Sequence, residues 1–423
     1  MNEILQENKL TAFIHNLSPT SLKFPEELLQ SATISLLTND FPTTRKEAWK
    51  YTRVGRIAAI KAATKIENST TPNLVTIDSN ALTFVFENGV FVPGISSAII
   101  PEGISIKPLS LCDAEELSQI GKLAKVEGEI FTAMNVAHAN DGLFIKISDH
   151  AILEQSIQIT HIITGENNVS NFRNYIHAGK FSKAHIIQGF FSQNAKNCFS
   201  NVVTEIVTGE NAFLTIDKIQ YEEMGNFHVA TEEVHQEKDS TFTINTLTLD
   251  GTLVRNNLNI GVKGVNCATH LNGIYLLKEN QHVDNHTIVD HCAPNCESHE
   301  LYKGVMDDSS AAVFNGKVFV RKDSQKINAF QSNANVLLSD SATINSKPEL
   351  EIYADDVKCS HGSTTGQLDD EAIFYLRARG ISEKSARHLM VSAFIGDVLG
   401  KIENEKVLEF THSILKDRFG WEF

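Results

Sequence analysis

The hydrophobic and polar positions change their period along the chain. Apolar residues recur at spacings of three and four in residues 18–40 and 43–65, which predicts two N-terminal helices. Residues 81–94 alternate instead, and Asn88-Gly89 lies between two short β runs, a strong signal for a tight hairpin. The N-terminal part is therefore expected to be helical with one β-hairpin.

Residues 141–359 are almost entirely short β runs broken by Gly, Asn and Asp. The turns between them are too short for the helices of a doubly wound parallel sheet, so an all-β architecture is expected. The tetrapeptide Thr-Gly-Glu-Asn begins at Thr164 and again at Thr208, 44 residues later, which would fit two solenoid coils of ~22 residues. A β-solenoid is therefore favoured, and a β-sandwich with long loops stays open.

A helical pattern returns after the β region. Asp369 or Asp370 would cap one helix, Gly380 would end it, and Ser382 would open another. The second helix carries an apolar stripe of Ala386, Leu389, Met390, Ala393, Phe394 and Val398. Because about 60 residues are too few for a large separate core, the stripe should pack on a neighbouring helix, on the solenoid end or on a partner protein. The candidate anchors for a partner are Phe374, Tyr375, Met390 and Phe394.

These changes of period divide the chain into three units. Residues 1–140 are expected to form an N-terminal helical region with a β-hairpin and the entry to the core. Residues 141–362 form the β core, and residues 363–423 form a C-terminal helical domain. The expected fold class is mainly β, with a solenoid core flanked by N-terminal and C-terminal α-helical regions.

Composition narrows the functional classes. The 423 residues are 42% hydrophobic, which is enough for a large core. A formal net charge of −15 without a dense Lys/Arg block argues against nucleic-acid binding. The N-terminus lacks the pattern of a signal peptide, and no run of about 18 apolar residues occurs, so a cytoplasmic protein without a membrane partner is expected. The six sparse cysteines are expected to be reduced thiols.

Few sequence motifs for chemistry are present. The sequence has no G-x-x-x-x-G-K-[ST] loop, so the chain is not expected to hydrolyse ATP by that route, and H-E-x-x-H, G-x-S-x-G and C-x-x-C are also absent. One group of candidate soft metal ligands consists of His282, His286, His291, Cys292, Cys296 and His299. Its spacing matches no zinc module, and a strand would point alternate residues to opposite faces, so packing within the β core is the favoured role.

Cys359 and His361 form the second candidate site. On a strand they would project to the same side, ~7 Å apart at the backbone. Such a pair could ligate a thiophilic metal, or the histidine could activate the thiol as a nucleophile. The plainer interpretation is a buried cysteine and a surface histidine at a domain junction. Two ligands leave an iron or zinc site incomplete, so a second chain or a substrate would have to supply the others.

Three segments resemble a known family. The sequence of residues 355–382, DDVKCSHGSTTGQLDDEAIFYLRARGIS, is similar to the C-terminal signature of the SufB/SufD family of iron–sulfur cluster assembly proteins. Residues 279–340 resemble the second long signature of this family, and the EAWKYT of residues 47–52 also fits it. The resemblance covers essentially the whole chain. The CSHG motif resembles the D subunit, whereas the B subunit usually has Cys-Glu-His-Glu there and often an N-terminal cysteine cluster.

The resemblance implies a right-handed parallel β-helix and a non-catalytic scaffold role in the SUF complex. The implied partners are a SufB-like subunit, bound through the β-helix, and a SufC-like ABC-type ATPase, bound by the C-terminal helices. His361 in the first place, and Cys359 in the second, are the implied ligands of iron or of a transient Fe–S cluster at the SufB interface. No tightly bound cofactor is expected in the isolated chain. Self-pairing of the isolated chain and flavin binding by the complex stay open.

Two other classes of function compete with this interpretation. A β-helix carbohydrate-active enzyme would use carboxylates and basic groups in a groove along the solenoid, but such enzymes are commonly secreted. A cysteine-dependent transferase using Cys359 and His361 would need a third orienting group and an oxyanion site, and the sequence identifies neither.

Overall fold

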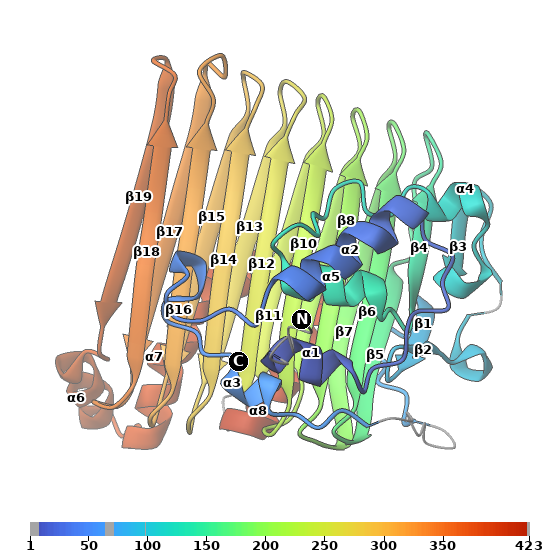
Figure 1. Cartoon of the computed structure of the whole chain (residues 1–423). Coiled ribbons are helices and arrows are strands. Elements are labelled where there is room, and N and C mark those ends of the chain that lie inside the picture. The colour runs from blue at the N-terminus through green and yellow to red at the C-terminus, as the bar shows by residue number, and fades with distance from the viewer. Residues whose placement is uncertain (1–7, 64–71, 98, 421–423) are drawn as a thin grey trace.

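Each coil of the chain from residue 141 onwards adds one strand to each of two parallel sheets. The computed structural model describes residues 8–63, 72–97 and 99–420, and its core is a parallel β-solenoid of about 8 turns (Figure 1). The predicted fold class, mainly β with a solenoid core and helices at both ends of the sequence, is confirmed.

Most odd-numbered strands form one sheet and most even-numbered strands form the other. The ten-stranded sheet contains, in spatial order, β19 (Val357–Gly366), β17 (Ile327–Leu337), β15 (Glu297–Met306), β13 (Ala268–Leu277), β11 (Thr241–Asp250), β9 (Phe213–Tyr221), β7 (Lys183–Lys196), β5 (Ile157–Glu166), β1 (Leu82–Glu87) and β2 (Val90–Phe91). The nine-stranded sheet contains β18 (Thr343–Ile352), β16 (Ala311–Val320), β14 (His282–His291), β12 (Leu253–Val262), β10 (Phe227–Gln236), β8 (Phe199–Thr208), β6 (Val169–Ala178), β4 (Asp141–Ile147) and β3 (Ile104–Pro108).

The coil length differs from the one predicted. Phe199 pairs in register with Phe227, and Phe227 pairs with Leu253. These three residues therefore occupy equivalent positions on three successive coils. Thr164 lies in β5 and Thr208 in β8, on opposite sheets, so the repeated tetrapeptide does not mark equivalent positions. The predicted coil of ~22 residues is therefore too short, because a coil here holds two strands of about ten residues and two turns.

Asparagine and aspartate allow the tight turns of the coils. Asn167, Asn197, Asp239 and Asn266 have φ values of 55–59°, a left-handed conformation that these two residue types adopt more readily than most. The turns also stack on one another. The Asn197 amide donates to Asn167 Oδ1 over 2.5 Å, and the Asn266 amide donates to Asp239 Oδ1 over 2.9 Å.

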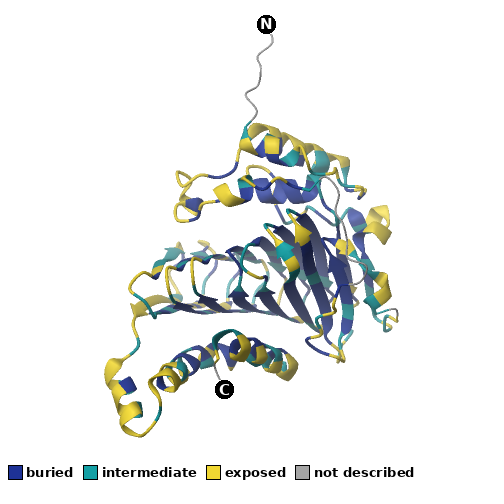
Figure 2. Ribbon diagram, turned by 90° about the horizontal axis from the view of Figure 1, so that it is seen from below, coloured by how far each residue is buried: buried dark blue, intermediate teal, exposed yellow. Residues whose placement is uncertain are grey.

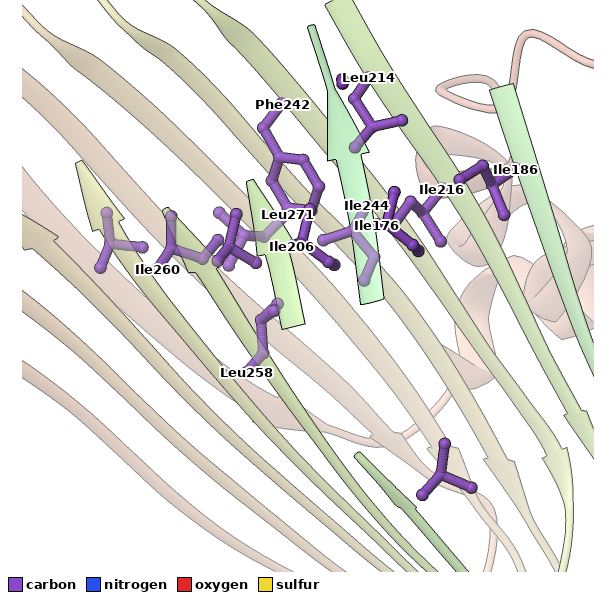
Figure 3. Packing of buried hydrophobic residues seen from close by; sticks show 14 of the residues in the cluster. Ile176, Ile186, Ile206, Leu214, Ile216, Phe242, Ile244, Leu258, Ile260 and Leu271 are labelled. Atoms are coloured by element: carbon purple, nitrogen blue, oxygen red, sulfur yellow. The ribbon is translucent and has the colours of Figure 1, made fainter. Parts of the chain in front are cut away.

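Aliphatic side chains form columns inside the solenoid (Figure 3). In the ten-stranded sheet, Ile186, Ile216, Ile244 and Leu271 are register partners on four successive coils. All four are at most 1% exposed. Because each buried aliphatic side chain stabilises the fold by ~1.5–3 kcal/mol, these columns hold the coils in one register.

The two ends of the solenoid differ. At the N-terminal end, β2 pairs with β1 and β3 pairs with β4, both antiparallel, and the β1–β2 turn is the predicted hairpin at Asn88-Gly89. At the other end β18 and β19 are each the last strand of their sheet. We call the inward-facing side chains of this last coil, Ser346, Cys359, His361 and Ser363, the solenoid mouth.

Helices cover the outer faces of the two sheets (Figure 2). The N-terminal region contains α1 (Lys9–Ile14), α2 (Glu26–Thr38), η1 (Glu47–Trp49), α3 (Gly55–Ala58), η2 (Pro93–Ile95), η3 (Leu109–Leu111), α4 (Ala114–Leu117) and α5 (Ile130–Ala137). The N-terminal helices share an apolar cluster with Phe199 and Phe227 of the nine-stranded sheet. No helix in the described part of the chain is long and apolar enough to span a lipid bilayer.

The predicted helix of residues 43–65 does not form. Only η1 and α3 are helical there, and Thr64 and Lys65 lie outside the described residues. Tertiary contacts override the local pattern, because Trp49 is 8% exposed and packs against Phe131 with ring centroids 5.4 Å apart. The predicted helix within residues 18–40 is confirmed as α2.

The C-terminal helices are α6 (Asp370–Ala378), α7 (Glu383–Leu399) and α8 (Glu405–Phe419). Asp369 caps α6 and Ser382 caps α7, in line with the sequence. α7 and α8 pack on the outer face of the ten-stranded sheet, where Val391, Ile395 and Val398 join its apolar cluster. The predicted stripe was partly wrong, because the buried face of α7 consists of Ala386, Val391, Ser392, Ile395, Val398 and Leu399, whereas Leu389 and Ala393 are exposed.

A buried ion pair clamps the EAWKYT segment to the solenoid. The Arg255 guanidinium lies 3.8 Å from the centre of the Trp49 ring, and its Nη1 donates to the Ala48 carbonyl over 2.8 Å and to Asp284 over 2.5 Å. Burial, the largest single effect, would raise the pKa of Asp284, but Arg255, His286 and Thr52 together outweigh it and hold the pKa well below its usual range. Thr52 also donates to Asp284. The buried charge pair thus holds the segment together with the Thr52 hydroxyl and the packing of Trp49 on Phe131.

Arg255→Leu should destabilise the chain by ~3–5 kcal/mol, because it leaves the buried Asp284 carboxylate without its counter-charge. Urea denaturation of both forms measures the difference. Arg321→Leu is the matched control, since Arg321 forms an exposed ion pair with Asp290 and should change stability little. Equal losses in the two variants would contradict the clamp.

Candidate functional site

The edge strand β19 places Cys359 and His361 on one face. Cys359 is the register partner of Ala329, and His361 is the register partner of Gln331. Ala329 and Gln331 are 0% and 3% exposed and face the solenoid interior. Since alternate residues of a strand share a face, Cys359 and His361 both point inward, at a coil that no further coil covers in the described sheets. The prediction that Cys359 and His361 project to the same side of their strand is confirmed, and that side faces the solenoid mouth.

Cys359 does not have the surroundings of an activated nucleophile. Burial raises the pKa of the Cys359 thiol, and the structure shows no hydrogen bond between Cys359 and His361 among the described residues. A nucleophilic cysteine needs a lowered pKa and a base in contact with it. A soft metal ion, by contrast, would itself displace the thiol proton on binding.

The interior becomes polar as the mouth is approached. The aliphatic column that includes Ile244 and Leu271 continues, register pair by register pair, into Glu300, Gln331 and His361. Gln331 Nε2 donates to Glu300 Oε2 over 2.7 Å. Three successive coils thus replace aliphatic side chains with hydrogen-bonding ones in this column, whereas Ile344, Leu350 and Val357 of the last coil stay apolar and pack against the core.

A second polar row reaches the mouth beside the first. The Asn333 amide donates to the Tyr275 hydroxyl over 2.9 Å, and the Ser346 hydroxyl donates to Asn333 Oδ1 over 2.8 Å. The Ser363 hydroxyl then donates to Ser346 Oγ over 2.8 Å, which joins β19 to β18 across the interior. One hydrogen bond therefore joins the two strands of the last coil, and another joins this coil to the preceding one.

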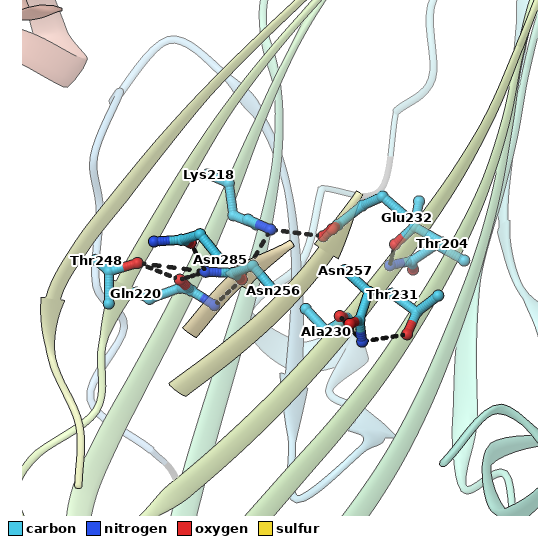
Figure 4. A network of polar contacts seen from close by, with 11 residues as sticks. Thr204, Lys218, Gln220, Ala230, Thr231, Glu232, Thr248, Asn256, Asn257 and Asn285 are labelled. Carbon is cyan, nitrogen blue, oxygen red and sulfur yellow. Dashed lines mark hydrogen bonds and ion pairs between the residues drawn. The ribbon is translucent and has the colours of Figure 1, made fainter. Parts of the chain in front are cut away.

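Buried polar groups also occur deeper in the solenoid (Figure 4). Lys218 donates to Glu232 over 2.8 Å and to Asn256 over 3.1 Å, and Gln220 also bonds Asn256. Both members of the Lys218–Glu232 pair are 1% exposed, and these bonds are internal to the coils. This network is a structural element of the interior and does not reach the mouth.

The histidines and cysteines of residues 282–299 lie on different surfaces. His291 is buried in the interior, with Nε2 2.9 Å from Ser298 Oγ, whereas His282 contacts Thr52 outside the nine-stranded sheet over 2.8 Å. His299 stacks with Phe330 on the outer face of the other sheet, with ring centroids 5.4 Å apart. In the described residues no group of three or more His, Cys, Asp or Glu side chains could hold a metal ion.

The four candidate docking residues fall into two environments. Phe374 and Tyr375 of α6 are 72% and 56% exposed. Phe394 of α7 is half-buried and packs against the solenoid, and Lys303 Nζ lies 4.7 Å from the centre of its ring and donates to its carbonyl over 2.6 Å. Met390 is half-buried. α6, which lies beyond β19 in Figure 1, therefore carries the larger free apolar surface.

Comparison with known proteins identifies the family. Residues 161–394 match the family model described as the SufBD core domain of SUF system FeS cluster assembly, and residues 11–159 match the SufBD protein N-terminal region. The chain belongs to the SufB/SufD family of iron–sulfur cluster assembly proteins. It is 31% identical to an iron–sulfur cluster assembly SufBD family protein of Synechocystis sp., over 85% of this chain and 84% of that protein. It is 30% identical to the iron–sulfur cluster assembly protein SufD of Escherichia coli, over 88% of this chain and 87% of that protein.

The sequence identified the SufB/SufD family correctly but did not reveal the polar residues that lie next to His361 in the solenoid interior. Glu300 and Gln331 were not among the candidate residues, although both lie within the second signature segment of the family. The signal that would have found them is the register, which places Glu300, Gln331 and His361 on consecutive coils. The coil length inferred from the repeated tetrapeptide was too short to reveal that register.

Glu300 gives this SufB/SufD solenoid a pH-dependent stability. Burial raises the pKa of the Glu300 carboxyl to about 7 from an ordinary value of 4.5. Between these two pH values the folded chain retains a proton that the unfolded chain has released, so the free energy of unfolding falls as the pH rises through this window. Above pH 7 this loss of stability is complete, and Glu300 causes no further change in the free energy of unfolding.

Glu300→Gln should therefore be more stable than the wild type at pH 8 and closer to it at pH 5, because the amide has no charge to bury. Urea denaturation at both pH values measures this difference. Glu297→Gln is the matched control, since Glu297 is exposed on the same strand. If Glu300→Gln and the wild type lose the same stability between pH 5 and pH 8, the buried carboxyl does not control it.

Proposed function

We propose that this chain is a non-catalytic cytoplasmic scaffold subunit of the SUF machinery, which pairs through its solenoid mouth with a SufB-like chain. The observation that carries this proposal is the position of Cys359 and His361 on an edge strand, which has a partner strand on one side only within the described sheet. The other side of β19 offers backbone groups to a strand of another chain. A second solenoid placed there would cover the mouth.

The mouth is half of a metal site. Cys359 and His361 supply a soft sulfur and an imidazole nitrogen, which suit iron and Fe–S clusters, but iron needs about four ligands. The SufB-like chain would supply the others, and the nascent cluster is cargo held at the interface until it is passed on. His361 is the preferred ligand because it is exposed, whereas Cys359 is half-buried against the core.

The C-terminal helices would bind a SufC-like ABC-type ATPase. ATP hydrolysis belongs to that partner, because this sequence has no phosphate-binding loop of the P-loop type. α7 and α8 are held by the solenoid, so the exposed rings of Phe374 and Tyr375 on α6 are the best anchors. Met390 and Phe394 are the secondary candidates, because both are half-buried and Phe394 packs against the solenoid.

His361→Ala should leave expression, thermal unfolding and pairing with the SufB-like chain nearly unchanged, since His361 is exposed and buries little apolar area. Cluster assembly should fall steeply, because water replaces a lost ligand poorly. Co-expression with SufB-like and SufC-like chains, followed by iron, labile sulfide and visible absorbance measurements on the purified complex, tests this expectation.

His299→Ala is the control for the His361 experiment, because His299 is also exposed on the ten-stranded sheet but faces outward. It should keep the wild-type amount of cluster. Cys359→Ser should be as severe as His361→Ala if both side chains bind iron, and mild if the thiol only packs. Wild-type cluster on the His361→Ala complex would refute the ligand role.

Phe374→Asp and Tyr375→Asp should abolish co-purification of the ATPase while leaving the chain folded, because a charge would enter an apolar interface at a cost of several kcal/mol. Ile34→Asp is the matched control, since Ile34 is 60% exposed on α2, which shares an apolar cluster with the nine-stranded sheet and not with the ten-stranded one. Retention of the ATPase by both α6 variants would place the docking surface elsewhere. Phe394→Asp should instead lower the stability of the chain.

A further inference from the structure

The row of Glu300, Gln331 and His361 contains a buried amide oxygen, that of Gln331, which is free to accept a hydrogen bond beside the mouth. Gln331 is 3% exposed, and its Nε2 donates to Glu300 Oε2 over 2.7 Å. Its other amide atom, Oε1, is fully buried and has no hydrogen-bond partner among the described residues. A buried carbonyl oxygen without a donor costs ~1–3 kcal/mol, so a donor in reach will be used.

The direction of the Gln331 amide follows from its neighbours on three sides. Glu300 lies one coil further from the mouth and receives the Nε2 proton. On the opposite sheet, Gly316 of β16 leaves room for the amide, because a Cβ there would lie 2.3 Å from Gln331 Nε2. The nitrogen and oxygen of a primary amide point apart, so Oε1 is directed away from Glu300. The next residue of the column on that side is His361.

Glu300 is itself held, which makes the row rigid. It is 4% exposed, and its second oxygen accepts a hydrogen bond from the Thr287 hydroxyl over 2.5 Å. Thr287 comes from β14 of the nine-stranded sheet and Glu300 from β15 of the ten-stranded one. The Glu300 carboxyl group is thus fixed by contacts from both sheets. Its hydrogen bond to Gln331 Nε2 in turn fixes the orientation of the Gln331 amide.

We propose that Gln331, oriented by Glu300, is the positioning residue for His361: its Oε1 accepts one imidazole N–H and leaves the other ring nitrogen as a lone pair facing the mouth. An imidazole that binds metal through one nitrogen commonly donates its other N–H to a fixed acceptor, which sets both the tautomer and the ring orientation. This inference rests on the proposed function only for the identity of the ligand. The hydrogen bond belongs to this chain alone.

Gln331→Met tests the row because it removes the amide but keeps an unbranched side chain of similar length. In the wild-type chain, selectively ¹⁵N-labelled at histidine and assigned with His361→Ala, we expect one His361 ring nitrogen with the shift of N–H and one with that of a lone pair. In Gln331→Met the two shifts should move toward each other as the tautomers exchange. Gln331→Leu should give the same change, so the result does not depend on one variant folding.

Two further variants separate positioning from general packing. Glu300→Gln keeps an oxygen that accepts from Gln331, so it should preserve the wild-type ring-nitrogen shifts. Gln220→Met makes the same chemical change at another buried interior amide, on β9, and should leave the His361 signals unchanged. If Gln220→Met alters them as much as Gln331→Met does, or if neither Gln331 variant alters them, the positioning role is overturned.

The complex with SufB-like and SufC-like chains provides a second readout. Loss of such a supporting residue typically weakens metal binding by about 10- to 100-fold, so the Gln331→Met complex should hold correspondingly less iron and labile sulfide. If His361→Ala loses the cluster but Gln331→Met changes neither cluster nor ring-nitrogen shifts, the positioning role alone fails. If His361→Ala keeps the cluster while Gln331→Met still changes the shifts, the proposed ligand function fails and the hydrogen bond stands.

Discussion

Parallel register between successive coils is the constraint on which the rest of this structure depends. Most core strands pair residue for residue with the strand one coil earlier, so their inward side chains lie on columns of equivalent positions. Aliphatic columns fix the register through burial, and a slip of one residue would turn every inward side chain outward. The aliphatic register also sets the positions of Glu300, Gln331 and His361, because these three residues extend the column of Ile244 and Leu271 toward the mouth.

Features set by neighbouring residues could be predicted from the sequence. The hairpin at Asn88-Gly89 and the helix caps at Asp369 and Ser382 were predicted correctly, because each depends on a few adjacent residues. The predicted helix of residues 43–65 failed because Arg255, which is distant in the sequence, fixes the position of Trp49. The prediction of the buried face of α7 was only partly correct, because the apolar pattern of a helix does not reveal which of its sides packs on the sheet.

The candidate site was predictable only in the part that lies on one strand. The period of two put Cys359 and His361 on the same face, and the structure has them there. Gln331 lies one coil earlier in the chain and Glu300 two coils earlier. Nothing local marks them as neighbours of His361, and the chain between them spans coils of unequal length. An error in the predicted coil length therefore prevents the recognition of Glu300, Gln331 and His361 as neighbours in one column.

The unequal ends of the solenoid also limit how far an assembly can grow. A stack of parallel strands that is open at both ends can add copy after copy, as fibrils do. Here the short antiparallel strands β2, of 2 residues, and β3, of 5 residues, form the first end, whereas in the described sheets the strands β18 and β19, of 10 residues each, form the last end. Two such solenoids that meet at their open ends leave no further edge at that junction. Stacking through this edge alone would therefore end at a pair.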